Sequence, residues 1–209
     1  MKPDGRIGIL ISGRGTNMET IIRAAEQRRI PAVVALVISD EADAAGLAKA
    51  ESHGVEALLL DRRQAASRED QDRRLAAALE ERRVDLVCLA GYMRILTPVF
   101  LKSYAGRILN VHPALLPAFP GLDSQRKALE HGVRVSGATV HFVDAGLDSG
   151  PIVLQAAVPV EQDDTPQTLA DRILKEEHRI YPDAIRLFFQ GRLRVEGRRV
   201  RILPAAPAE

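Results

Sequence analysis

The sequence predicts an α/β protein with a doubly wound, mostly parallel sheet, antiparallel strands toward the C-terminus and a long C-terminal helix. Three observations predict this fold class. Short β-branched runs alternate with longer amphipathic segments, the runs are almost continuously apolar, and two strand-like segments after residue 135 have no room for a helix between them. Near-continuous apolarity is typical of strands that helices cover on both faces, so the alternation predicts βαβ units.

Five strands and four helices make up the predicted parallel part. The strands are short runs rich in Val, Ile and Leu, and the segments between them have apolar residues at helical spacing. Connections of this kind are right-handed crossovers, which make neighbouring strands parallel. The predicted strands cover residues 6–11, 32–38, 56–60, 84–90 and 107–111, and the predicted helices cover residues 16–29, 43–53, 67–83 and 122–131.

The pattern changes after residue 135. VSGATVHFV and IVLQAAVPV are separated only by DAGLDSGP, so they are expected to pair antiparallel. A final helix follows, with Asp164 or Thr165 as N-cap, Pro166 in the first turn and a bend expected near Pro182. Residues 1–190 are expected to form one domain, and residues 191–209 a hairpin followed by a disordered tail.

Composition excludes several classes of protein. The 209 residues are 46% hydrophobic and 27% charged with a net charge of +1, which gives no field that favours nucleic acid or an acidic membrane surface. No apolar stretch reaches the roughly 18 residues of a membrane span, and no secretory signal is visible, so a cytoplasmic protein is expected. Cys88 is the single cysteine, and its apolar surroundings indicate a buried strand residue rather than a nucleophile.

The first predicted strand ends in a glycine-containing turn, ISGRGTNMETI. Gly13 and Gly15 permit a tight turn and a close approach of the backbone, and Thr16 and Asn17 are suited to cap the helix that begins there. Amides at a helix N-terminus bind phosphate, and Arg14 adds positive charge. The spacing fits neither GxGxxG nor the Walker pattern, so a turn that merely joins strand to helix is the alternative.

Polar residues follow the strand in ILNVHPALLPAFPG. Asn110 and His112 are two residues apart and project from the same side of an extended chain, at the carboxyl edge where ligands bind in such sheets. An Asn amide stabilises a developing oxyanion, and His transfers protons near neutral pH. Asp144 and Asp148 are expected at the same edge, where a carboxylate orients an imidazole and favours its charged form. The alternative is that these are ordinary hydrogen-bonding loop residues.

Together, the motifs ISGRGTN, LAGYMRIL, NVHPALLPAFPG and ATVHFVDAGLDSGPI closely resemble the phosphoribosylglycinamide formyltransferase family, in the same order and over about residues 6 to 190. The resemblance implies a Rossmann-like formyltransferase domain over residues 1–190. It also implies transfer of a formyl group from the co-substrate 10-formyltetrahydrofolate to the amine of glycinamide ribonucleotide in de novo purine biosynthesis, without a metal. The catalytic residues that it implies are Asn110, His112 and Asp148.

The resemblance also implies binding residues. Those for the nucleotide substrate are Gly15, Thr16 and Asn17 at the phosphate and Glu177 at the amine. Those for the folate are Arg68, Met93, Arg94, Ile95, Leu96 and Asn110. The residues alone leave alternatives open, because Glu177 lies on an apolar helical face where a nearby arginine is an equally suitable partner. Met93, Ile95 and Leu96 also fit ordinary core packing.

One segment departs from the family pattern. The family often carries histidines in GLHxH, whereas this chain reads GLDSQ, with Asp123 and Gln125 at those positions. His141 in VHFV is expected to be a satisfied core histidine rather than a group that supports the catalytic residues. The expected partners are small-molecule substrates, with neither nucleic acid nor membrane, and the expected state is a monomer or homodimer.

Three other functions are alternatives to this one. A formyl-folate deformylase uses a similar Asn, His and Asp set but carries an extra N-terminal regulatory domain, whereas this chain begins at its first strand. A methionyl-tRNA formyltransferase needs a larger C-terminal domain than the 20 or so residues after the last helix. A nucleotide-binding module without chemistry is disfavoured by the intact set of Asn110, His112 and Asp148.

Overall fold

The computed structural model describes residues 5–205, which form two compact units. The first unit ends at Asn110 and the second begins at Val111. The last part of the predicted disordered tail, residues 206–209, lies outside the described residues.

The first unit is built on a parallel sheet with the order β3-β2-β1-β4-β5. This arrangement confirms the predicted fold class, because β1 lies centrally and the chain winds outward from it in both directions. Strand β5 starts in the first unit and its last two residues belong to the second. The strands are β1 Gly5–Ile11, β2 Ala32–Ser39, β3 Ala57–Leu59, β4 Leu86–Leu89 and β5 Ile108–His112.

Helices cover both faces of this sheet. A Cβ at Gly8 of β1 would meet Leu79 of α3, whereas Ile11 of β1 lies against Gly46 of α2. Positions 8 and 11 point to opposite faces of a strand, so α2 and α3 lie on opposite sides of the sheet. Helix α1 contacts α2, and α3 contacts α4. The helices are α1 Thr16–Glu26, α2 Ala45–Ser52, α3 Arg68–Glu81 and α4 Pro98–Ser103, with a short 3-10 turn η1 at Arg62–Gln64.

Helix α4 is an element that the sequence analysis did not predict. It has six residues, too few to show a helical period, although Pro98 stands in its first turn after Thr97 as N-cap. The four helices that were predicted between the strands are present as α1, α2, α3 and α5 (Ser124–Glu130), and each is slightly shorter than expected. Cys88 is fully buried in β4, as its apolar surroundings predicted.

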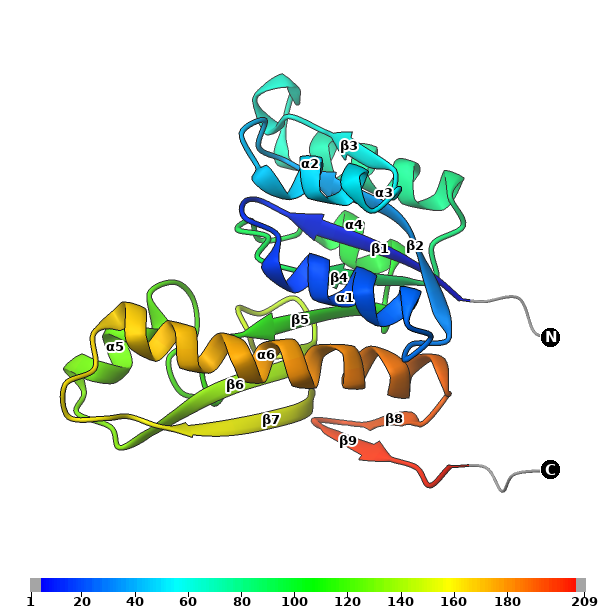
Figure 1. Cartoon of the computed structure of the whole chain (residues 1–209). Helices are drawn as coiled ribbons and strands as arrows, with labels where there is room; N and C mark the ends of the chain where they lie inside the picture. The colour runs from blue at the N-terminus through cyan, green and yellow to red at the C-terminus, as the bar shows by residue number, and fades with distance from the viewer. Residues whose placement is uncertain (1–4, 206–209) are drawn as a thin grey trace. The chain divides into compact units, whose positions relative to one another are not determined.

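The second unit contains an antiparallel pair and a long helix. Strands β6 Val135–Phe142 and β7 Ile152–Pro159 pair antiparallel, and helix α6 Pro166–Phe189 packs along both (Figure 1). Strands β8 Leu193–Glu196 and β9 Arg199–Ile202 pair antiparallel, and β9 continues the sheet beside β7. A short helix, α5, spans Ser124–Glu130.

The start of α6 shows why the helix begins where it does. Thr165 is the N-cap, and its side chain and that of Thr168 form a reciprocal capping box. Asp164, the other predicted cap, instead accepts hydrogen bonds from Arg172 at 2.6 and 2.9 Å. Pro182 lies inside the helix.

Candidate active site

The glycine turn after β1 is held by helix α2. Gly15 has a left-handed backbone with φ of 70°, and the amide of Gly46 donates to the carbonyl of Gly13 at 3.0 Å. A Cβ at Gly15 would lie 2.9 Å from the Cα of Gly46, so the turn leaves no room for a side chain. Gly15 itself is the N-cap of α1. The expectation that Thr16 or Asn17 caps this helix is therefore wrong, because the left-handed glycine brings the chain into the helix one residue earlier.

The segment predicted to contact folate follows β4. Met93 and Ile95 are 65% and 58% exposed, which excludes the alternative that they are core residues, whereas Leu96 is buried at 6%. The guanidinium of Arg68 donates to the carbonyl of Ile95 at 2.8 Å. The structure thus brings together two of the predicted folate-binding elements, α3 and the segment after β4. Asn110 pairs in register with Leu89 at the end of β4.

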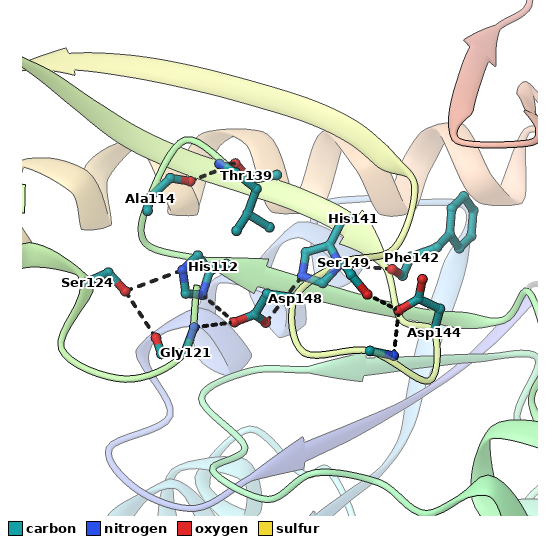
Figure 2. Close-up of polar contacts among 12 residues, drawn as sticks. His112, Ala114, Gly121, Ser124, Thr139, His141, Phe142, Asp144, Asp148 and Ser149 are labelled. Atoms are coloured by element: carbon teal, nitrogen blue, oxygen red, sulfur yellow. Dashed lines mark hydrogen bonds and ion pairs between the residues drawn. The ribbon is translucent and has the colours of Figure 1, made fainter. Parts of the chain in front are cut away.

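In the second unit, the buried His112 pairs with the half-buried Asp148. Nδ1 of His112 lies 3.3 Å from Oδ2 of Asp148, and the same oxygen accepts the amide of Gly121 at 2.8 Å (Figure 2). His112 is 5% exposed. Asp148 has a left-handed backbone with φ of 48°, which Asp adopts more readily than most residues. The carboxylate predicted to reach the histidine therefore does so.

The other ring nitrogen of His112 also faces oxygen atoms. Nε2 lies 2.9 Å from the carbonyl oxygen of Phe119 and 3.3 Å from the hydroxyl of Ser124. A carbonyl only accepts, and so does a carboxylate, so an imidazolium that donates from both nitrogens satisfies both partners. This arrangement is suited to a positively charged His112.

Three of these partners were missed by the sequence analysis. Ser124 stands inside GLDSQ, the segment that departs from the family pattern, and is buried at 2%. Gly121 and Phe119 contribute backbone groups, for which side-chain motifs carry no signal. The three prolines that precede GLDSQ, at positions 113, 117 and 120, were the available hint, since they favour a loop after the strand. Asp123 pairs with Arg126 and has a left-handed backbone at the start of α5.

His141 lies on the far side of Asp148 from His112 (Figure 2). Its Nδ1 is 2.9 Å from the carbonyl of Phe142, and its Nε2 is 3.7 Å from Oδ1 of Asp148. It is buried, as expected for a core histidine, and in addition it faces the Asp148 carboxylate. Burial lowers the pKa of His141 below its ordinary value of 6.5, while the Phe142 carbonyl and Asp148 oppose this shift.

The lowered pKa of His141 predicts a loss of stability in acid. A histidine that is neutral when folded contributes stability above its unfolded pKa of about 6.5, and this contribution is lost as the pH falls toward the folded pKa. Between pH 7.5 and 5.5, the free energy of unfolding in urea should therefore fall less for His141→Gln than for the parent protein. His131→Gln, at an exposed histidine, is the control and should behave like the parent. Equal losses in the His141 variant and the parent would contradict the prediction.

Glu177 is placed as its pattern predicted. It is 7% exposed and lies on the same face of α6 as Leu169, Ile173 and Ile180, which are buried. The predicted residues are therefore divided between the units. The first unit holds Gly15–Asn17, Arg68, Met93–Leu96 and Asn110, and the second holds His112, Asp148 and Glu177.

Residues 5–185 match the family model described as formyl transferase. The chain belongs to the formyl transferase family. A family member from Escherichia coli, named phosphoribosylglycinamide formyltransferase, is 45% identical over 90% of this chain and 89% of its own length. A crystal structure of glycinamide ribonucleotide transformylase 1 from Symbiobacterium toebii is 59% identical, covers 98% of this chain and 96% of its own, and has a TM-score of 0.96.

Some formyl transferase family members are much longer. The trifunctional purine biosynthetic protein adenosine-3 of Gallus gallus is 44% identical over 91% of this chain, which spans only 19% of that protein's length. Within residues 5–205 of this formyl transferase, every helix is too short or too polar to cross a membrane. The same residues contain no group of three or more His, Cys, Asp or Glu side chains placed to hold a metal ion.

Proposed function

We propose that this chain transfers a formyl group from 10-formyltetrahydrofolate to the amine of glycinamide ribonucleotide, a step of purine biosynthesis. The observation that carries the proposal is its match to the Escherichia coli phosphoribosylglycinamide formyltransferase over about nine-tenths of both chains. The pair of His112 and Asp148 supports it, because a positively charged hydrogen-bond donor stabilises the oxyanion that forms in acyl transfer. The proposed place of the reaction is the cytoplasm.

The proposed reaction is a direct transfer. The amine nitrogen attacks the formyl carbon, and the electron pair of the C=O bond moves to oxygen, which gives a tetrahedral intermediate. Collapse of this intermediate re-forms C=O and breaks the bond between the carbon and N10 of the folate. The proton that leaves the amine ends on N10. Every atom is conserved, and the protein forms no covalent bond.

Each catalytic residue has a proposed role in this reaction. Protonated His112 and the amide of Asn110, two residues earlier on β5, stabilise the oxyanion. The oxyanion takes over one of the hydrogen bonds that His112 donates in this structure, such as the one to the Phe119 carbonyl. Asp148 supports the positive charge of His112 and orients its ring through Nδ1.

The binding residues have proposed roles as well. The turn at Gly15, Thr16 and Asn17 binds the nucleotide phosphate, because it combines a left-handed glycine with the start of α1. Arg68 and the segment Met93–Leu96 bind the folate, and their contact through the Ile95 carbonyl supports a shared role.

One assay tests the proposed function against its alternatives. The protein is incubated with 10-formyltetrahydrofolate, with and without glycinamide ribonucleotide, and release of tetrahydrofolate is followed. Release that requires the amine is expected. Release without the amine would indicate a deformylase, and no release in either case would indicate a binding module.

Glu177 supplies a test of the substrate amine site. If its buried carboxylate binds the amine, Glu177→Gln should raise the KM for the nucleotide about tenfold or more, because a charge-assisted hydrogen bond is lost. Glu176→Gln is the matched control, since Glu176 instead pairs with Arg179 at 2.6 Å, and its KM should be unchanged. Steady-state kinetics and urea unfolding are measured on both variants. Loss of stability without a change in KM would show that Glu177 is structural.

A further inference from the structure

The segment from Tyr92 to Thr97 has no regular secondary structure, yet its backbone is held at alternate residues. The amide of Met93 donates to the hydroxyl of Ser12 at 3.0 Å, and the carbonyl of Ile95 accepts from Arg68 at 2.8 Å. The amide of Thr97 donates to Asp72 at 2.6 Å. Three side chains of the first unit therefore fix the segment from outside: Ser12, directly after β1, and Arg68 and Asp72 on α3.

Ser12 is in turn oriented by a buried carboxylate. Its hydroxyl donates to Oδ1 of Asp40 at 2.7 Å, and Asp40 is 0% exposed. A serine hydroxyl has a single proton, so donation to Asp40 leaves its lone pairs to accept the Met93 amide. Arg62 lies 3.7 Å from Oδ2 of Asp40 and offsets part of the charge. Asp40 thus orients the Ser12 hydroxyl so that its oxygen accepts the hydrogen bond from the Met93 amide.

The way in which the segment Met93–Leu96 is held favours a role in binding a ligand. Met93 and Ile95 expose 65% and 58% of their surface, so the packing of these two side chains contributes little to holding the segment. A segment that is already ordered binds its ligand without a further loss of conformational entropy. The hydrogen bond to Ser12 is at the first residue of Met93–Leu96, soon after the end of β4 at Leu89.

We propose that Ser12, oriented by Asp40, is a positioning residue that holds the backbone of Met93–Leu96 in the conformation that binds the formyl-folate co-substrate. This inference rests on the proposed function. Ser12 acts through the backbone of Met93 and has no part in the chemical step. Its loss therefore weakens binding of the co-substrate and leaves turnover almost unchanged.

The test is Ser12→Ala, which removes the acceptor of the Met93 amide. The KM for 10-formyltetrahydrofolate should rise about tenfold, with kcat and the KM for the nucleotide within about twofold of the parent values. Ser12→Thr keeps the hydroxyl and should restore the KM. Ser39→Ala is the control, because Ser39 is a buried hydroxyl that bonds the backbone of Glu41 instead, and it should leave the KM for folate unchanged.

The outcomes separate this inference from the proposed function. An active parent enzyme whose Ser12→Ala variant keeps the parent KM for folate would overturn the inference alone. Equal rises in both KM values would also overturn it, because they indicate a general disturbance of the glycine turn. If no formyl transfer occurs in the parent, the proposed function fails and the inference fails with it. If Ser12→Ala does not fold, Ser12→Cys replaces it, since a thiol is a weak acceptor and should raise the same KM.

Discussion

Asp148→Asn is expected to slow formyl transfer by on the order of 100-fold to 1000-fold in turnover, because it removes the charge that supports protonated His112, the group proposed to stabilise the oxyanion. The substitution keeps the size of the side chain, and Asn tolerates the left-handed backbone at this position. What it removes is the negative charge 3.3 Å from Nδ1 of His112. Turnover is measured at saturating substrates with a parallel urea unfolding curve.

The matched control for this variant is Asp144→Asn. Asp144 lies in the same loop and is exposed, and it accepts hydrogen bonds from Gly146 and Ser149 rather than from His112. An amide oxygen can still accept these bonds, so turnover should stay within a few-fold of the parent value. Equal losses of turnover in the two variants would show that turnover depends on the structure of the loop and not on the charge of Asp148.

The three proposed catalytic residues should also act as a unit. Asn110→Ala is expected to lower turnover by on the order of 100-fold to 1000-fold, or about 3 to 4 kcal/mol. Because members of a catalytic unit are not additive, Asn110→Ala combined with His112→Ala should lose much less than the product of the single losses. A double-mutant cycle on turnover measures this. Fully multiplicative losses would show that the two residues act independently.

Gly15→Val should weaken nucleotide binding by at least about tenfold while folate binding falls much less, because a side chain would occupy the place where the phosphate is proposed to approach. The structure predicts that Gly15→Val also lowers the stability of the protein. At φ of 70° a β-branched residue is strained by roughly 1 to 2 kcal/mol, and its Cβ would lie 2.9 Å from Gly46. Equilibrium binding of each ligand is measured on the folded fraction.

Gly54→Val separates the strain from the effect at the site. Gly54 has φ of 69° and no atom within 4 Å of the position of an added Cβ, so it reproduces the backbone strain without the contact. This variant should lose stability and keep its affinity for the nucleotide. Loss of both ligands to the same degree in Gly15→Val would count against a phosphate site at the turn.

The sequence was sufficient to predict the fold class and the main strands, because short buried strands and capped helices carry strong local patterns. Strand β1 is nearly continuously apolar, and α6 begins with a threonine cap followed by proline. Helix α4 was missed because six residues do not complete two turns, so no period shows.

The site was predictable where side chains carry the chemistry and not where the backbone does. Residue types and positions predicted a carboxylate, Asp144 or Asp148, beside His112, and the family resemblance implied Asp148. The structure places Asp148 3.3 Å from His112. The Phe119 carbonyl and the Gly121 amide depend on how a proline-containing loop returns to the strand, which follows from tertiary contacts. The predicted N-cap of α1 was wrong for a related reason, since the packing of Gly15 against Gly46 decides where that helix begins.

The left-handed backbone at position 148 restricts which residues can stand there more than the need for a negative charge does. A glutamate would keep the negative charge but tolerates this conformation less well, and its longer side chain would move the carboxylate relative to the Gly121 amide. A glycine would fit the backbone and lose the charge. Aspartate is the residue that combines a short carboxylate side chain with tolerance of positive φ. The shape of the main chain and the acidity of the side chain are therefore selected together at this position.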